Sequence, residues 1–464
     1  MAFFSSKEET INFRSSNWFE QYLAFRLEHP ASLDIPDPVQ FGLSEEQVRE
    51  VPILQNPLYA MLLHSGIVYG FPFLSPFKPV PPGDYEDRWR TKLILLDTIL
   101  FSTIEDLKQR DGARSHYPEQ LEEAGNLIRA YYRGILSAHA GDEVFSIEQQ
   151  LAHRVMFHRN WLDWRRTGIN AHLFWDWFFF QLYMREAVRG RGADFDFEAL
   201  VAEKKAMKWL SMQLIAAAAH SDRKVKRREG ILAHHFQKSA QFFSQGERDR
   251  LGRMFEKGIR LDELHFPETE WMAKRYWLDL SLLVIYADKE IHEAEEGFLH
   301  QLMHRLGLPE SELTESKLAL GGFLLRFGRK MPFISGRKSS LALIGQALAQ
   351  NFSKMQKATH AEYKETLDMA VTLGRLLQHQ VGLGKGKSLP SEEEIRAAFN
   401  QIKDLPKFLP FFTIIFVPVP GITELYLLLA YSIERLSGDS LRLLPSHFSK
   451  MVKGEKDPEE ESDQ

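Results

Sequence analysis

The sequence contains no cysteine among its 464 residues. This absence excludes disulfide bonds, thiol catalysis, thiolate zinc sites and cysteine-ligated iron–sulfur clusters. A strong excess of either charge is also missing, because 58 basic residues face 63 acidic ones and the net charge is −5. That balance is not typical of a general nucleic-acid binder, so we expect no DNA partner.

Familiar catalytic signatures are missing as well. The sequence has no GxxxxGK[ST] phosphate loop, no nucleophile–base motif and no repeated Glu-x-x-His pairs of the ferritin-like kind. We therefore expect a protein that is not an enzyme. The first 25 residues also lack a basic region followed by an apolar stretch, so we expect no secretory signal there and a chain that stays largely in the cytoplasm.

Alternating strand-like patterns are nearly absent, and apolar residues recur instead at three- and four-residue spacing. This spacing predicts helices over Trp89–Leu107, Gln120–Leu136, Lys204–Ala219 and Tyr363–Leu377. The proline-rich segment Phe71–Gly83 cannot continue a helix. A chain of this length is too long for one compact core, so the expected fold class is all-α with several domains.

The segment His172–Met184 is densely aromatic and is interrupted by Asp176. Its length favours a buried core helix over a membrane span. The alternative is a helix that lies on a lipid surface, because Trp and Phe favour that depth.

One long apolar run, Phe408–Tyr431, has the length of a membrane helix, and Glu424 is its only charge. Pro418 and Pro420 interrupt it near the middle. Two geometries are open: a proline-broken membrane helix, or a helical hairpin that is buried in protein or enters one leaflet. The preceding region, Lys330–Lys387, is basic, and its charge suits lipid headgroups or ribosomal RNA.

Two segments 66 residues apart align without gaps and predict an internal repeat. Asp222 matches Asp288 and Glu229 matches Glu295, in each case after an apolar helix and at the start of the next one. These carboxylates suit a Ca²⁺ or Mg²⁺ site. The alternative is that they cap free backbone N–H groups at the helix N-termini.

A separate stripe lies on the helix that follows the second copy. Glu296, His300 and His304 recur at four-residue steps, so the three side chains share one helix face. This face has the ligand types of a zinc site, or it is a solvated or partner-facing surface.

The repeat resembles the TerB-like family of helical tellurite-resistance domains. The resemblance lies in Ala217–Asp222 and Tyr286–Asp288 and covers roughly residues 197–325, with Arg223 and Lys289 where the family usually has glycine. It implies that a divalent cation (Ca²⁺, Mg²⁺ or Mn²⁺) is bound by four carboxylates, those of Asp222, Glu229, Asp288 and Glu295.

The C-terminal part resembles the Letm family of inner-membrane proteins, which are implicated in cation/proton exchange. The matching positions are Pro410, Phe411, Pro418, Glu424, Leu444, Pro445, Ser446 and Phe448. The resemblance implies a membrane-lipid partner and a ribosome-associated role. Glu424 is the candidate transport residue, beside carbonyl groups freed by Pro418 and Pro420.

Together, the TerB-like middle and the Letm-like end resemble the Letm-related, biofilm-associated proteins of Bacteroidetes-type bacteria. The expected localisation is therefore the bacterial cytoplasm and inner membrane. The expected domains are an N-terminal helical domain (1–197), a TerB-like domain (198–325), a basic helical region and linker (326–402), a Letm-like apolar segment (403–450) and a disordered acidic tail (451–464).

Two functions are open at this point. One is a membrane-associated, non-enzymatic protein that senses metal and takes part in cation homeostasis or ribosome and envelope association. The other is a soluble, all-helical stress or biofilm-associated interaction protein with a buried C-terminal hairpin. The sequence leaves the protein partners open.

Overall fold

The computed structural model describes a defined set of residues: 10–33, 53, 56–75, 77–83, 85, 87–112, 116–140, 145–157, 168–222, 227–240, 244–288, 291–328, 331 and 343. The chain divides into two compact units. The first comprises residues 1–34 and 61–307, and the second comprises residues 35–60 and 308–464. The apolar run 408–431, the motif positions between 410 and 448, most of the basic region and the acidic tail lie outside the described residues.

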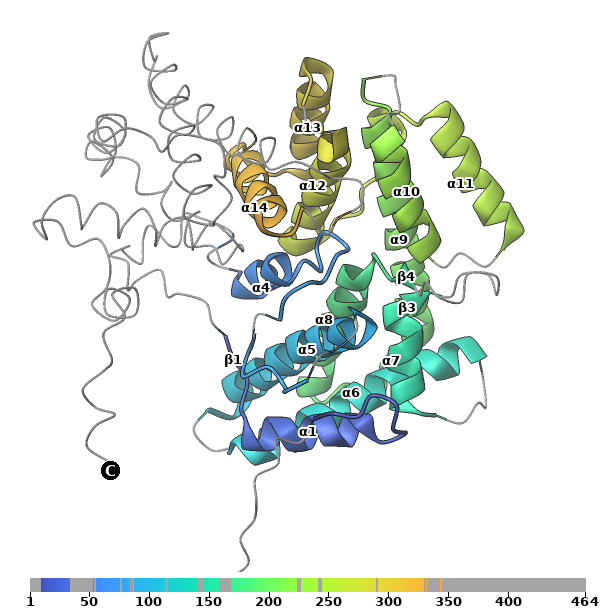
Figure 1. The fold of residues 1–464 in the computed structure, drawn as a ribbon. Coiled ribbons are helices and arrows are strands. Elements are labelled where there is room, and N and C mark those ends of the chain that lie inside the picture. The colour runs from blue at the N-terminus through green and yellow to red at the C-terminus, as the bar shows by residue number, and fades with distance from the viewer. Residues whose placement is uncertain are drawn as a thin grey trace, which may run out of the picture. The chain divides into compact units, whose positions relative to one another are not determined.

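The described part of the chain is mostly helical, which confirms the all-α prediction (Figure 1). In the first unit the helices are α1 (Trp18–Glu28), α5 (Asp87–Asp111), α6 (Tyr117–Ala140), α7 (Ile147–Val155), α8 (Leu173–Val188), α9 (Phe197–Ala219), α10 (Arg227–Ser239), α11 (Gln245–Lys257), α12 (Trp271–Ile285) and α13 (Glu293–Leu306). Two 3₁₀ turns, η4 (Leu261–Glu263) and η5 (Tyr286–Asp288), flank α12. Among the described residues, none of the helices has both the length and the apolarity to cross a membrane.

Extended structure is confined, in the described ranges, to two short antiparallel pairs. β1 (Ser32–Leu33) pairs with β2 (Phe77–Lys78), and β3 (Met156–Phe157) pairs with β4 (Gly168–Ile169). In the second unit the described helix is α14 (Ser311–Phe327), while α4 (Pro57–Ser65) begins in the second unit and ends in the first.

Three of the four predicted helical windows lie within α5, α6 and α9, and the fourth, Tyr363–Leu377, lies outside the described residues. Apolar spacing could predict α6 because this helix buries one face, whereas α5 is buried on every side over residues 91–100 and α9 over residues 214–219. The described residues of the segment Phe71–Gly83 contain β2 and no helix, as its prolines predict.

The aromatic helix α8 forms the centre of the core in the first unit. Trp175, Trp177 and Phe179 are fully buried, which confirms the prediction of a core helix rather than a lipid-facing one. The ring of Phe174 stacks on Tyr276 of α12 with centroids 4.0 Å apart. This contact joins α8 to a helix that follows it by about a hundred residues.

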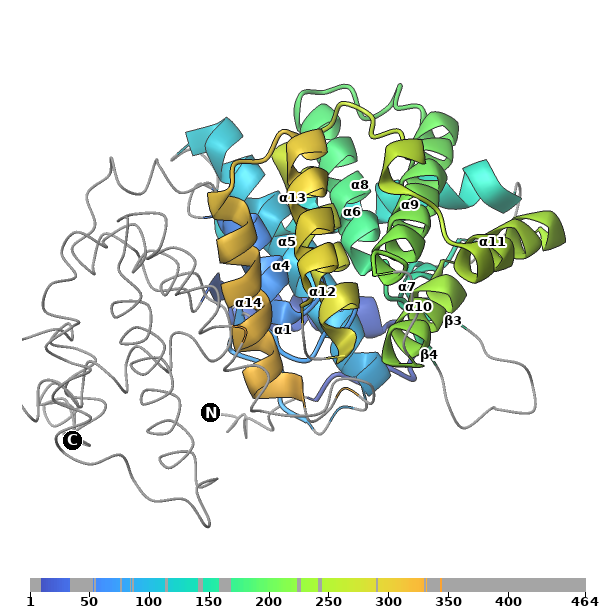
Figure 2. The same cartoon turned by 90° about the horizontal axis from the view of Figure 1, so that it is seen from above.

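The internal repeat is visible in the helix boundaries. α9 ends at Ala219 and α12 ends 66 residues later at Ile285, while α10 begins at Arg227 and α13 begins 66 residues later at Glu293. The equivalent helices α9 and α12 pack against each other, and each packs against the shorter helix of its own copy (Figure 2). The two copies therefore bury their apolar faces together, as repeated units do.

Helices α6 and α9 approach each other closely at Gly134. A β-carbon at this position would overlap the ring of Phe197, which is the first residue of α9.

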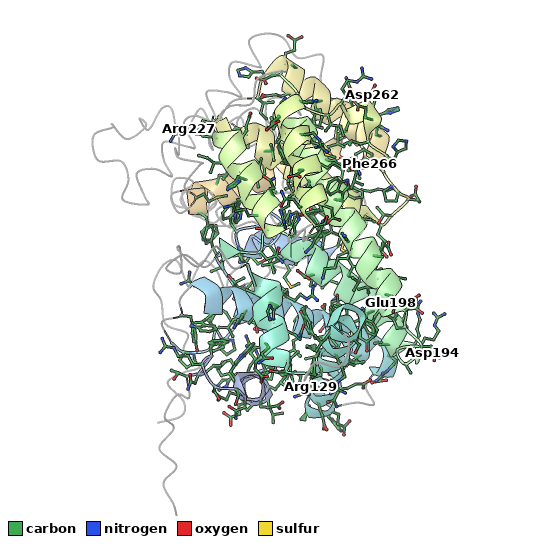
Figure 3. The ribbon with its side chains drawn as sticks, turned by 90° about the vertical axis from the view of Figure 1, so that its right-hand side faces the viewer. Arg129, Asp194, Glu198, Arg227, Asp262 and Phe266 are labelled. Carbon is green, nitrogen blue, oxygen red and sulfur yellow. The ribbon has the colours of Figure 1, made fainter. Side chains whose placement is uncertain are left out.

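The N-terminus of α9 is capped by Asp196. Its side chain accepts a hydrogen bond from the Ala199 N–H at 2.9 Å, next to Glu198, which is labelled in Figure 3. Arg227, at the start of α10, is labelled in the same view.

Candidate functional site

The turn in the second copy of the repeat is built around Glu295. Its carboxylate lies in the first turn of α13, is buried, and accepts a hydrogen bond from the His292 backbone N–H at 2.6 Å. This bond satisfies a backbone donor at the helix N-terminus, where negative charge is also favourable. Capping, one of the two interpretations left open by the sequence, thus describes what Glu295 does in this structure.

The other predicted metal ligands occupy equivalent positions. Glu229 is buried in the first turn of α10, and Asp222 is half-buried in the turn after α9. Asp288 ends η5, and its side chain lies outside the described residues. Within the described ranges, no three or more His, Asp or Glu side chains are gathered in a way that could hold a metal ion. The divalent-cation site, whose predicted set includes Asp288, stays a prediction.

Two residues of the stripe on α13 contact each other. His300 Nε2 lies 3.5 Å from Glu296 Oε1, one turn away, and both side chains are partly exposed. His304 lies in the last turn and is exposed. The structure therefore pairs two of the three predicted residues.

A buried charged cluster that we did not predict lies at the junction of α8 and α9. Asp176 on α8 is 1% exposed, and Lys204 and Lys208 on α9 are 5% and 6% exposed. Lys204 Nζ donates to Asp176 Oδ1, and Asn170 Nδ2 donates to Asp176 Oδ2 at 3.0 Å. We use the name Asp176 cluster for the charged and phenolic groups gathered here: Asp176, Lys204, Lys208, Arg154, Tyr131 and Tyr132.

Burial and the neighbouring charges shift the protonation of this cluster. Burial alone would raise the pKa of Asp176, but the positive charges of Lys204, Lys208 and Arg154 outweigh it, so the pKa is lowered. At Lys204 and Lys208, burial lowers the pKa by more than the negative charge of Asp176 raises it. The pKa of Lys204 falls to about 7.

Several polar atoms around Asp176 are buried without a partner in the described part of the chain. They are the hydroxyls of Tyr131 and Tyr132, the Nε atom of Arg154 and the Nδ1 atom of His172. An unsatisfied buried polar group costs about 1–3 kcal/mol. This concentration therefore calls for a physical explanation.

His172 borders the cluster and is held in one tautomer. Its Nε2 donates to the Phe236 carbonyl at 3.0 Å, which leaves Nδ1 as the unpartnered acceptor in the neutral ring. Burial, followed by the charge of Lys208, lowers the pKa of His172 to about 3, so the ring is neutral at neutral pH.

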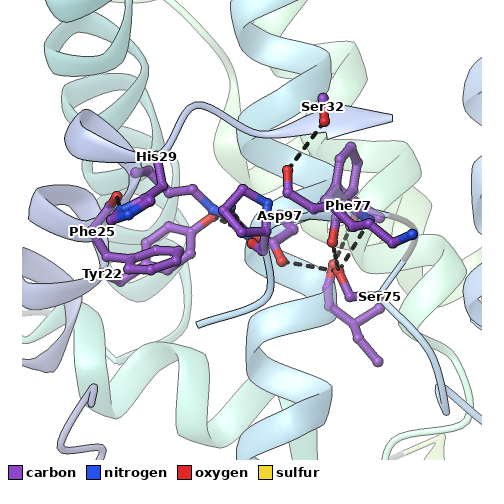
Figure 4. Close-up of polar contacts among 12 residues, drawn as sticks. Tyr22, Phe25, His29, Ser32, Ser75, Phe77 and Asp97 are labelled. Atoms are coloured by element: carbon purple, nitrogen blue, oxygen red, sulfur yellow. Dashed lines mark hydrogen bonds and ion pairs between the residues drawn. The ribbon is translucent and has the colours of Figure 1, made fainter. Parts of the chain in front are cut away.

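A second buried charged centre, around Asp97, offers a comparison within the same unit (Figure 4). Asp97 Oδ1 accepts hydrogen bonds from Tyr22 at 2.8 Å and from Arg26 Nε at 3.0 Å, and Asp97 Oδ2 accepts one from Ser75 at 3.1 Å. Arg26 also donates to the Pro79 carbonyl at 2.9 Å. Here one cation faces one carboxylate, and hydrogen bonds surround both, as expected of a centre that stabilises packing.

The hydroxyl of Ser211 joins three helices of the core. It accepts hydrogen bonds from Trp175 Nε1 at 3.0 Å and from Trp277 Nε1 at 3.2 Å, and it donates to the Met207 carbonyl at 2.9 Å. α8 carries Trp175, α9 carries Ser211 and α12 carries Trp277. One small side chain thus satisfies two buried indole donors.

The sequence held a signal for the Asp176 cluster. Lys204 and Lys208 fall on the same face of α9 as Leu200 and Ser211, all of which are buried. Two lysines on an apolar face, together with an Asp inside an aromatic helix, indicate a buried charged contact. The helical pattern alone could not show that Arg154 and the two tyrosines join them.

Comparisons with protein-family models, with curated proteins and with solved structures find no match to this chain. The TerB-like and Letm-like resemblances rest on the sequence motifs described above.

Proposed function

We propose that this chain is a membrane-associated, non-enzymatic protein, as its resemblance to the Letm-related biofilm-associated proteins implies. The observation that carries the proposal is the predominantly apolar run Phe408–Tyr431, which spans 24 residues with Glu424 as its only charge. A helix needs about 20 such residues to cross the hydrocarbon core. In this proposal the run anchors the chain at the bacterial inner membrane and takes part in cation homeostasis.

The helical repeat gives this membrane protein its proposed sensing part. A divalent cation would be held at the second turn, where Asp288 and Glu295 lie close in sequence among other glutamates. Carboxylate oxygens are the ligands that Ca²⁺, Mg²⁺ and Mn²⁺ prefer. The ribosome, approached through the basic region, is a second proposed partner alongside lipid.

A metal-dependent melting curve tests the sensing part. The variant with both Asp288→Ala and Glu295→Ala should lose any rise in Tm that Ca²⁺ or Mn²⁺ gives the unaltered chain. Because Glu295 also caps α13, its removal should cost about 1 kcal/mol without metal, so the readout is the metal-dependent change in Tm. Glu293→Ala, at an exposed position of the same turn, is the matched control. A response that persists in the double variant would refute the site.

A second candidate function is a soluble interaction protein whose apolar hairpin is buried. The specific observation in its favour is α8, whose aromatic residues Phe174–Phe180 are buried in this fold. The segment 408–431 is comparable in its apolar content. The segment 408–431 could therefore also be buried in protein.

Membrane fractionation separates the two functions. The full chain is compared with a chain that ends at Asp404, and both pellets are washed with alkaline carbonate. The first proposal expects only the full chain to stay in the pellet. Release of the full chain by the wash would overturn it and favour the interaction protein.

A further inference from the structure

The Asp176 cluster contains more basic than acidic side chains. Three cationic side chains, Lys204, Lys208 and Arg154, act on one carboxylate, that of Asp176. Lys204 forms the ion pair, while the charges that act on Lys208 are Asp176 and Arg154. When both lysines are protonated, one carboxylate leaves positive charge uncompensated, and keeping that charge buried is costly, which is why the pKa values of both lysines fall.

Unused hydrogen-bond donors lie in the same neighbourhood. The charges of Asp176 and Arg154 act on both Tyr131 and Tyr132, so the two phenols lie near the charged groups. Both hydroxyls and the Arg154 Nε–H are buried, and none has a partner in the described ranges. The groups that lack partners are thus mainly donors, and they accompany the excess of positive charge.

The Asp97 centre shows how the same fold satisfies a purely structural charge. There one arginine faces one aspartate, and the tyrosine, serine and guanidinium groups all form hydrogen bonds. Buried water could satisfy the donors of the Asp176 cluster, but water would leave the charge imbalance in place. A bound anion would accept hydrogen bonds from these donors and would also balance the positive charge.

The geometry points to a binding site for a small oxyanion of the phosphate class, held by Lys208 and Arg154 and hydrogen-bonded by the hydroxyls of Tyr131 and Tyr132. Charge-assisted hydrogen bonds from lysine, arginine and tyrosine are the usual means of holding phosphate oxygens. Asp176 keeps Lys204 oriented and prevents the site from carrying the full repulsion of three cations. The site lies in the first unit and does not depend on membrane association.

Titration of the full chain with inorganic phosphate tests this site. At a hundredfold excess over Kd, a bound ligand should raise Tm by about 5 °C for a unit of this size. Phosphate also stabilises proteins by exclusion from their surface, so the specific effect is the difference between variants. Lys208→Met should raise Kd at least tenfold. Lys205→Met is the control, because Lys205 is 59% exposed on the same helix and pairs with Glu247.

Tyr132→Phe keeps the test decisive if Lys208→Met does not fold. This variant removes an unpartnered hydroxyl, so Tm without phosphate should be unchanged or higher, while phosphate binding should weaken about three- to tenfold. Glycerol 3-phosphate is titrated in parallel, and binding of either compound with this variant pattern supports the site. An equal rise in Tm for the unaltered chain, Lys208→Met and Tyr132→Phe, or an equal rise with sodium chloride of the same ionic strength, would overturn it.

Discussion

Replacing Ser211 by alanine should destabilise the first unit far more than the loss of one hydroxyl suggests. Ser211→Ala leaves the indole N–H groups of Trp175 and Trp277 without an acceptor in fully buried positions. Each unsatisfied donor costs about 1–3 kcal/mol. The better helix propensity of alanine returns about 0.5 kcal/mol. We therefore expect a net loss of about 2–5 kcal/mol in the free energy of unfolding.

Ser281→Ala is the matched control for this experiment. Ser281 is equally buried on α12, but its hydroxyl donates only to the Trp277 carbonyl of its own helix, at 2.8 Å. Its loss should cost within about 1 kcal/mol, because no other helix depends on it. Denaturant titration followed by near-ultraviolet circular dichroism reports the tryptophans directly. Equal midpoints for Ser211→Ala and Ser281→Ala would refute the bridging role of Ser211.

Three further predictions concern packing, pH and transport. Gly134→Ala should lower Tm because its β-carbon would overlap Phe197, whereas Gly230→Ala, with open space around it in α10, should leave Tm unchanged or raise it. Stability should rise with pH between about 3 and 6.5, because the unfolded chain binds a proton at His172 that the folded chain does not. His172→Gln should make this limb shallower by up to about 1.4 kcal/mol per pH unit, as denaturant midpoints measured from pH 4 to 7 would show. Glu424→Gln should end cation/proton exchange in vesicles while the chain still inserts, and full exchange by this variant would contradict the transport role.

The helices with the strongest apolar spacing could be predicted from the sequence, because local periodicity reflects which face is buried. α6 illustrates this, while the aromatic density and length of α8 indicated its core position. The repeat was also readable, because matching residues at a fixed spacing imply matching helix ends. The helical periodicity depends on near neighbours in the sequence, and the repeat is found by comparing two segments 66 residues apart.

The Asp176 cluster could not be predicted in full, because it depends on contacts between distant segments. Tyr131 and Arg154 lie on α6 and α7, and the lysines lie on α9. A helical pattern does not show which helix faces which. The two interpretations of Glu295 could not be separated either, because a cap and a metal ligand use the same carboxylate at the same position.

Two arginines in the apolar run test membrane association, the central claim, most directly. Ile414→Arg together with Ile415→Arg should cost about 5–7 kcal/mol if these residues lie near the middle of a bilayer. We predict that the unaltered full chain resists alkaline extraction and that the double variant is released. Ile231→Arg, at a position on α10 that is 43% exposed, should behave like the unaltered chain. Release of the unaltered chain, or retention of the double variant, would contradict the claim.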